Sequence, residues 1–181
     1  GEKLGEKATI KNLARGGLSP RSFIDKGLWD EAIQQVNAGD LVLIQFGGND
    51  GNKSRPERYV HAYRGYSENL RRFISEIRAK NGIPVLVTSP TAHYYNGDGT
   101  LRRSWGDYPA AMRGVASDTG AFLIDAEDYT FQRQNLLGKD ATVHLFMVSV
   151  DGKDTTHFTK EGADIVINGV QFFAITSGNY E

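Results

Sequence analysis

The sequence predicts an α/β domain, built as a three-layer sandwich around a parallel sheet. Short and almost continuous apolar runs alternate along the chain with longer segments in which apolar residues recur at helical spacing. The runs lack the polar alternation of a half-exposed strand, which is typical of parallel strands covered on both faces. Because right-handed crossovers join strands that alternate with helices, the layers follow from the order of the segments.

Four segments are predicted to be strands. The clearest is Leu41–Phe46, in which five of the six residues in Leu-Val-Leu-Ile-Gln-Phe are apolar. Residues 84–88 and 121–124 have the same character. A further short strand is expected at residues 8–13, before the first predicted helix.

The firmest helix is predicted to begin near Tyr63 and to close at Asn81-Gly82, a pair typical of helix C-termini. A C-terminal helix is expected after Thr159, a favourable N-cap residue. The apolar stripes that predict these two helices are Tyr63, Tyr66, Leu70, Phe73, Ile74 and Ile77, and Ala163, Val166, Ile167, Val170 and Phe173. Weaker helical patterns cover residues 28–36, 108–117 and 126–137.

The composition is that of one ordinary globular domain over residues 1–181, with 39% hydrophobic and 24% charged residues. A net charge of −1 with scattered basic residues argues against nucleic-acid or anionic membrane partners. The absence of cysteine excludes disulfides and thiolate metal sites. No membrane-spanning run or signal sequence is visible, and this pattern does not separate a secreted from a cytoplasmic protein.

Chemistry-bearing residues follow several predicted strands, where open α/β sheets bind their ligands. Gly16-Gly17 follows the first, and its backbone N–H groups can approach a ligand closely. Gly47-Gly48-Asn49-Asp50 follows the second. Near the C-terminus Asp154 precedes His157 by three residues, which brings together a carboxylate and an imidazole. This acid–base pair, with two candidate oxyanion donors, predicts acyl transfer.

An aromatic segment follows the third strand. His93 and Tyr95 are predicted to bind substrate, and Tyr94 and Trp105 are further candidates to stack on a sugar. A surface loop with scattered aromatic residues is an equally good interpretation of this segment. The other histidines, His61 and His144, have no partner in sequence and are taken as structural.

Each of these features is compatible with a plain turn or cap when taken alone, but their joint order resembles the SGNH/GDSL hydrolase superfamily, in its rhamnogalacturonan acetylesterase-like branch. The resemblance covers essentially the whole chain. It rests on four blocks, which are residues 12–17, Phe46-Gly47-Gly48-Asn49-Asp50, residues 84–88, and Asp154-Thr155-Thr156-His157-Phe158-Thr159.

The resemblance implies a role for each residue. Gly17 N–H and the Asn49 side chain are expected to be oxyanion donors, His157 the general base, and Asp154 its orienting carboxylate. It implies neither a cofactor nor a metal. One departure is Gly48, because this branch often has histidine at that position.

The larger departure concerns the nucleophile. The family has a first strand that ends in Gly-Asp-Ser, a few tens of residues before the block at Asn12, but residues 1–11 contain no serine. We therefore expect a flavodoxin-like SGNH fold with the first strand missing, in a chain that is truncated or degenerate at its N-terminus. Ser19 and Ser22 are the nearest substitute hydroxyls, but Pro20 and the following helix favour a capping role for them.

The expected function is hydrolysis of carboxylic esters, on acetylated carbohydrate or small acyl esters. The alternative from another class is a catalytically silent carbohydrate- or acyl-binding module that retains the cleft. A metal-dependent phosphoesterase using Asp50, Asp154 and His157 ranks last, because a two-metal site needs more ligands.

Assembly follows from the missing strand. In the flavodoxin-like order 2-1-3-4-5 that strand lies between residues 8–13 and Leu41–Phe46, so its loss leaves unpaired strand edges in the middle of the sheet. We expect residues 8–13 either to close onto Leu41–Phe46 or, preferably, to join the sheet of a second copy in a swapped homodimer.

Overall fold

A computed structural model describes residues 8–176 of the chain. In this part the helices are α1 (Pro20–Asp25), α2 (Leu28–Gln34), η2 (Ala62–Tyr66), α3 (Ser67–Ala79), α4 (Tyr108–Thr119), α5 (Ala126–Leu137), α6 (Lys139–Thr142), η3 (Val143–Leu145), α7 (Val148–Asp151) and α8 (Lys160–Thr176). The strands are β1 (Leu41–Phe46), β2 (Ile83–Thr88) and β3 (Phe122–Ile124).

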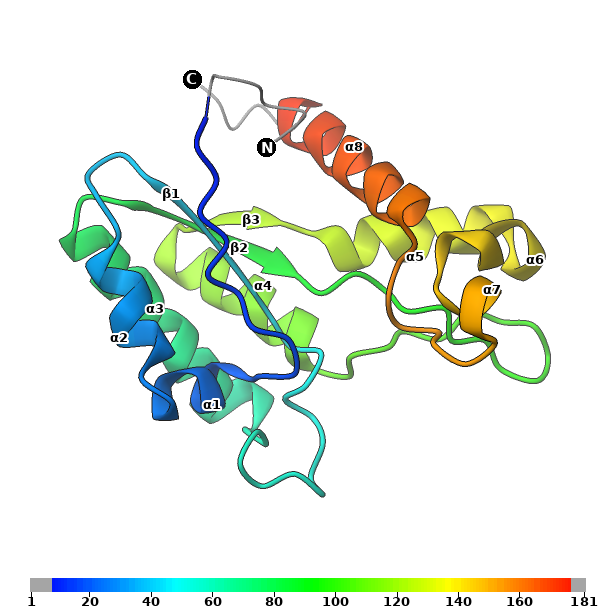
Figure 1. Cartoon of the computed structure of the whole chain (residues 1–181), viewed down its shortest axis with the longest axis horizontal. Coiled ribbons are helices and arrows are strands. Elements are labelled where there is room, and N and C mark those ends of the chain that lie inside the picture. The colour runs from blue at the N-terminus through cyan, green and yellow to red at the C-terminus, as the bar shows by residue number, and fades with distance from the viewer. Residues whose placement is uncertain (1–7, 177–181) are drawn as a thin grey trace.

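The sheet is parallel, with the strands in the order β1-β2-β3. Leu43 lies opposite Val85, and Val85 lies opposite Phe122. Helices α3 and α4 connect the strands and pack against the sheet (Figure 1). The predicted α/β class, the parallel sheet and three of the four predicted strands are confirmed.

The main core lies between the sheet and helices α2, α3 and α4. Phe73 and Ile77 of α3 are fully buried, and Trp29 of α2 stacks on Phe73 with ring centroids 3.9 Å apart. Ile44 and Leu86 supply the sheet's side of this core. The stripe that predicted the helix therefore marks the buried face of α3.

The predicted helix has one break and a well-defined end. Arg64 has non-helical φ and ψ, which places a kink inside the π-helical turn η2, and Tyr63 before it is exposed. At the other end Asn81 has φ +58, and the N–H of Gly82 donates to the carbonyl of Ile77. The predicted Asn-Gly cap is confirmed, and the break reflects backbone geometry that hydrophobic spacing does not encode.

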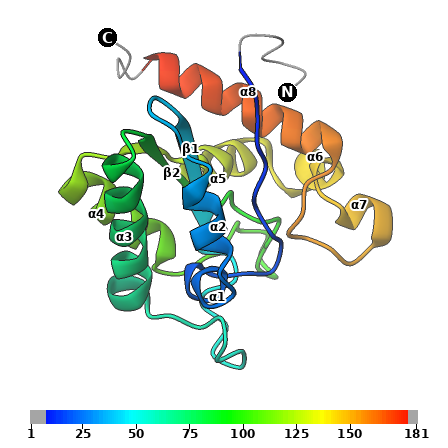
Figure 2. The same cartoon turned by 60° about the vertical axis from the view of Figure 1, so that its left-hand side comes forward.

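The strand predicted at residues 8–13 is wrong. This segment is extended but belongs to no sheet, and most of its residues are exposed. Figures 1 and 2 show it outside the sheet, before the chain turns into α1. Residue type favoured a strand here, but a strand needs a hydrogen-bonded neighbour, and within residues 8–176 nothing pairs with this segment.

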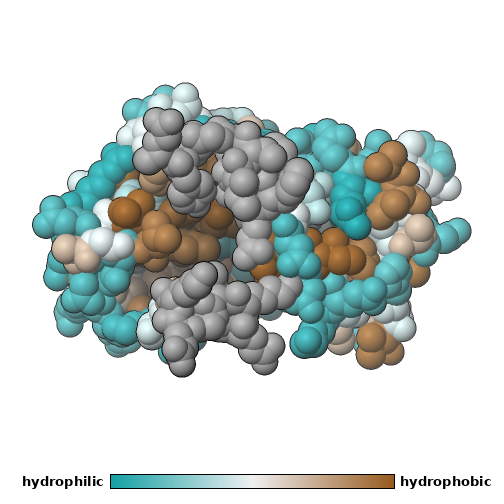
Figure 3. Space-filling model, turned by 90° about the horizontal axis from the view of Figure 1, so that it is seen from above, coloured by the Kyte–Doolittle hydropathy of each residue, from teal (hydrophilic) through white to brown (hydrophobic). Residues whose placement is uncertain are grey.

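The outer edge of β1 is open in the described part of the chain, because β2 is its only strand neighbour there. Leu41 and Leu43 of β1 are 59% and 64% exposed, and Phe122 of β3 is 47% exposed. Leu43 and Phe122 lie on the same face of the sheet, since both are in register with Val85. Seen from above, the molecule shows a patch of apolar side chains (Figure 3). The helix on this side, α8, packs against α5 and η3.

We expect this open edge to make the chain associate, with residues 8–13 of one copy pairing with β1 of another. Light scattering at micromolar concentration tests the homodimer. The variant Leu43→Lys places a charge among the exposed apolar side chains of β1 and is expected to weaken the association. A well-folded monomer that persists on concentration would contradict it.

Candidate active site

The Asp154–His157 pair comes from the loop between α7 and α8. His157 Nδ1 lies 2.7 Å from Asp154 Oδ2, and Asp154 Oδ1 accepts the backbone N–H of Thr156 and of His157 at 2.9 and 3.0 Å. These hydrogen bonds, led by that from the backbone of His157, lower the pKa of Asp154 to about 2. An ionised carboxylate on Nδ1 leaves Nε2 as the ring nitrogen that can take a proton.

Two neighbouring segments hold this loop through three hydrogen bonds. The N–H of Met147 donates to the carbonyl of His157, and the N–H of His93 donates to the carbonyl of Thr155, both at 2.8 Å. The hydroxyls of Tyr94 and Thr156 share a hydrogen bond of 2.9 Å. The imidazole itself is 77% exposed. The loop is therefore well anchored while its base stays open to a ligand.

Gly17 and Asn49, the predicted oxyanion donors, lie near each other, and none of the contacts described for them reaches the Asp154–His157 pair. Asn49 Nδ2 donates to the carbonyl of Leu18, the residue after Gly17, at 3.3 Å. Asn49 Oδ1 accepts from Arg58 at 3.3 Å, and Arg58 Nη1 would lie 3.8 Å from a Cβ placed on Gly17. Gly17 has φ +76, a left-handed conformation that glycine adopts without strain. Arg58 is the residue here that sequence reasoning missed, because it stands in a charged loop without a motif.

The loop that carries Asn49 is tightly packed behind. Gly47 has φ +117, and a Cβ on it would lie 3.2 Å from Tyr108 Cβ. A Cβ on Gly51 would lie 3.1 Å from the Tyr108 ring, whereas one on Gly48 would have 3.8 Å to Trp105. Gly47 is thus required by its backbone conformation and its surroundings, and a side chain at Gly51 would press on the Tyr108 ring. Gly48 would accept a Cβ in ordinary contact with Trp105.

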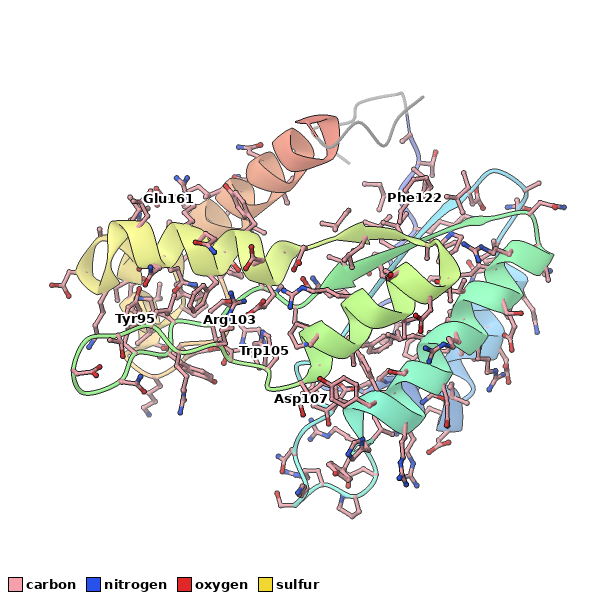
Figure 4. The ribbon with its side chains drawn as sticks, turned by 180° about the vertical axis from the view of Figure 1, so that it is seen from behind. Tyr95, Arg103, Trp105, Asp107, Phe122 and Glu161 are labelled. Atoms are coloured by element: carbon pink, nitrogen blue, oxygen red, sulfur yellow. The ribbon has the colours of Figure 1, made fainter. Side chains whose placement is uncertain are left out.

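An open cleft of about 560 Å³ lies in front of this loop. Gly47 and Gly48 contribute to its lining, together with the aromatic residues Tyr59, Tyr94, Trp105 and Tyr108. The indole N–H of Trp105 donates to the carbonyl of Pro90 at 2.7 Å, which fixes the ring. Figure 4 shows Trp105 and Asp107 on the segment that leads into α4. The cleft thus runs from the Asn49 loop to Tyr94, whose hydroxyl bonds the loop of the acid–base pair.

The structure places His93 and Tyr95 away from this cleft. His93 is 5% exposed, its Nε2 lies 3.1 Å from the carbonyl oxygen of Lys139, and burial lowers its pKa. Its ring packs against Tyr95 and Phe146. The Tyr95 hydroxyl points to Gln134, and Figure 4 shows Tyr95 well apart from Trp105. These positions do not support substrate binding by His93 and Tyr95; their neighbour Tyr94 lines the cleft instead.

Ser19 and Ser22 form a capping box at the start of α1. Ser22 N–H donates to Ser19 Oγ at 3.2 Å, Ser19 N–H donates to Ser22 Oγ at 2.9 Å, and Pro20 occupies the first turn. Both serines are buried. The predicted capping role is confirmed by these contacts.

We expect Ser19→Ala to lower the free energy of unfolding by about 1 kcal/mol, because it removes the acceptor for the Ser22 N–H. Urea denaturation measures this loss. Treatment with a fluorophosphonate followed by mass spectrometry is expected to leave both serines unmodified, and a covalent adduct on either would contradict the assignment.

The metal-dependent alternative is not supported. Within residues 8–176 no group of three or more His, Asp and Glu side chains is arranged to hold a metal ion. Asp50, Asp154 and His157 therefore do not form a common ligand set. In the same residues, no helix is both long and apolar enough to cross a bilayer.

Comparison with known proteins shows which family and which proteins this chain is similar to. Residues 1–165 match the GDSL-like Lipase/Acylhydrolase family. The chain is 32% identical over 164 residues to the probable rhamnogalacturonan acetylesterase YesY of Bacillus subtilis, covering 91% of this chain and 75% of the relative. It is 30% identical over 172 residues to the rhamnogalacturonan acetylesterase RhgT of the same species, covering 90% and 72%.

Among solved structures, the crystal structure of the Bacillus subtilis protein YxiM aligns with a TM-score of 0.81 at 24% identity. The alignment covers 95% of this chain and 47% of YxiM, so the chain spans about half the length of that protein. This likeness supports the fold.

Proposed function

Because the chain belongs to the GDSL-like Lipase/Acylhydrolase family, we propose that it hydrolyses carboxylic esters, with acetyl esters of carbohydrate as its substrates. The observation that carries the proposal is the 2.7 Å contact between His157 Nδ1 and Asp154 Oδ2, on an imidazole that is 77% exposed. The two rhamnogalacturonan acetylesterases among its relatives support acetylated rhamnogalacturonan as the polymer.

The proposed reaction uses His157 as a base and then as an acid. Nε2 takes a proton from the attacking hydroxyl or water, whose oxygen bonds to the acyl carbon. The carbonyl oxygen becomes an oxyanion, which Gly17 N–H and Asn49 Nδ2 would stabilise. When the carbon–oxygen ester bond breaks, the imidazolium returns the proton to the leaving alcohol. Asp154 remains ionised and stabilises the imidazolium.

Ser19 and Ser22 are not part of this proposal, because both hydroxyls are buried in the capping box. With water as the attacking group, His157 acts on it directly. Sites that lack a triad nucleophile but keep the oxyanion donors retain roughly a thousand-fold rate acceleration over water. We therefore expect slow but measurable turnover from residues 1–181.

The test is acetate release by the purified chain. We expect release from acetylated rhamnogalacturonan above that from acetylxylan, and release of p-nitrophenol from its acetate ester above the rate in buffer. Rates equal to buffer on all three substrates would contradict ester hydrolysis by this chain.

A silent binding module is the second candidate, and one observation favours it. Within residues 8–176 no serine hydroxyl hydrogen-bonds the His157 ring. This candidate predicts that calorimetry detects acetylated oligosaccharide binding without acetate release, and that Trp105→Ala weakens the binding because it removes an aromatic wall of the cleft.

A further inference from the structure

Asp50 is a buried carboxyl group for which the reaction described above has no use. It has no exposed surface, and its Oδ2 accepts the backbone N–H of Gly47 at 3.0 Å. Its Oδ1 has no hydrogen-bond partner among residues 8–176. Its own carbonyl accepts the N–H of Val60 at 3.3 Å. A buried carboxyl oxygen without a partner is costly, so its presence needs a reason.

Among residues 8–176, no cation compensates this carboxyl. The titratable groups that face it are Tyr66 from η2 and Tyr108 from α4, whose hydroxyls donate to the carbonyls of Phe46 and Val60 at 3.1 and 2.6 Å. Burial raises the pKa of both phenols, that of Tyr108 to about 12, so neither is charged near neutrality. Tyr59 and Asp107 face Tyr108 and help to raise the pKa of its phenol. The nearby cation, Arg58, donates its hydrogen bond to Asn49 and not to Asp50.

The bond from Gly47 to Asp50 closes a short loop that contains Asn49. Gly47 begins the turn out of β1 with φ +117, and its N–H is held by the side chain three residues later. Asn49 lies inside this ring, so the same hydrogen bond constrains the backbone from which its side-chain amide reaches Leu18 and Arg58. Behind the loop, Tyr66 and Tyr108 leave no space for it to retreat, as the close approaches to Gly47 and Gly51 show.

We propose that Asp50 is a positioning residue, which fixes Asn49 as an oxyanion donor by holding the Gly47 N–H and which does so in its neutral form. The proposal rests on the function proposed above. A neutral carboxyl keeps an acceptor oxygen for Gly47, whereas an ionised one would place a second negative charge behind the oxyanion.

The protonation state follows from burial. Desolvation raises the pKa of Asp50 from 3.8 to about 7, against the opposing effect of the backbone hydrogen bonds. Because the folded-state pKa lies above the ordinary value, the folded protein binds this proton more tightly between pH 4 and pH 7. The contribution of Asp50 to stability is therefore fully present below pH 4 and is lost as the pH rises through about 7.

Three variants test this inference. Asp50→Ala removes the acceptor and is expected to lower kcat roughly ten-fold to a hundred-fold with little change in KM, because the displaced group acts on the transition state. Asp50→Asn keeps a neutral acceptor oxygen and is expected to restore kcat and to remove any decline in activity near pH 7. Asp118→Asn, an exposed carboxylate on α4 that pairs with Arg71, is the matched control and should change neither.

Two readouts separate this inference from the proposed function. The side-chain amide signal of Asn49 in ¹⁵N–¹H spectra should shift in Asp50→Ala and return in Asp50→Asn. The difference in melting temperature between pH 5 and pH 8 should be smaller in Asp50→Asn than in the parent chain. If no variant shows esterase activity but both readouts behave in this way, the proposed function fails and the positioning role stands. If both the Asn49 signal and kcat are unchanged in Asp50→Ala, the positioning role of Asp50 is wrong.

Discussion

Replacing His157 by alanine is expected to abolish the esterase activity of this chain. Every route to ester hydrolysis through this site needs a base that takes the proton of the attacking oxygen, and His157 Nε2 is the ring atom that Asp154 leaves available. The loop itself should survive the change, because it is anchored through backbone groups of Met147 and His93 and through the Tyr94 hydroxyl. The variant should therefore fold and melt normally.

The measurement is p-nitrophenol release from its acetate ester by purified variants, corrected for the rate in buffer. His144→Ala is the matched control, since His144 is also exposed but pairs with Glu161 at the start of α8. Turnover that persists in His157→Ala at the parent rate would remove His157 from the reaction and with it the assigned site.

Replacing Asn49 by alanine is expected to lower kcat by roughly a hundred-fold to a thousand-fold, the usual effect of losing one oxyanion donor. The loss should fall on kcat, because the oxyanion exists only in the transition state. The substitution also frees the carbonyl of Leu18 and the guanidinium of Arg58, both of which Asn49 contacts. Both groups are near the surface, so we expect only a small loss of stability.

A comparison of kcat with KM decides this prediction. A change confined to KM would show that Asn49 binds the ground state and does not stabilise an oxyanion. Asn37→Ala, which removes an exposed amide next to β1, controls for the loss of a polar group near the same strand and should leave both constants unchanged.

The parts of the fold that the sequence predicted are those with strong local signals. The apolar run of β1 predicted a strand, and the apolar stripe of α3 marks the face that lies in the core. The run did not show which face of β1 is buried, because it suggested cover on both faces, whereas Ile44 is buried and Leu41 and Leu43 are exposed. Residues 8–13 show the limit of this reasoning, because a strand is defined by its neighbour as well as by its residues. Hydrophobic spacing could not reveal that this segment has no described partner.

The candidate site divides in the same way. Asp154 and His157 are three residues apart, and such closeness on one loop allowed the sequence to predict their contact. The lining of the cleft depends on which way neighbouring aromatic side chains point, so Tyr94 and Trp105 could not be separated from His93 and Tyr95. The contact of Arg58 with Asn49 and the burial of Asp50 arise from the way the loop after β1 packs against its neighbours. No sequence motif describes that packing.

The three glycines beside β1 differ in how freely they could change during evolution. Gly47 has φ +117 and is confined by Tyr66 and Tyr108, so nearly every substitution there would be eliminated as a folding defect. A side chain at Gly51 would press on the Tyr108 ring, so substitutions there require that ring to shift. A Cβ on Gly48 would make ordinary contacts with Trp105 and Ser89, at 3.8 and 3.9 Å, so a substitution there could appear without moving the backbone. A saturation library at the three positions should therefore return glycine at Gly47, few residues besides glycine at Gly51, and a range of residues at Gly48, including histidine. Selection can thus change the chemistry at the mouth of the cleft while the loop behind it stays fixed.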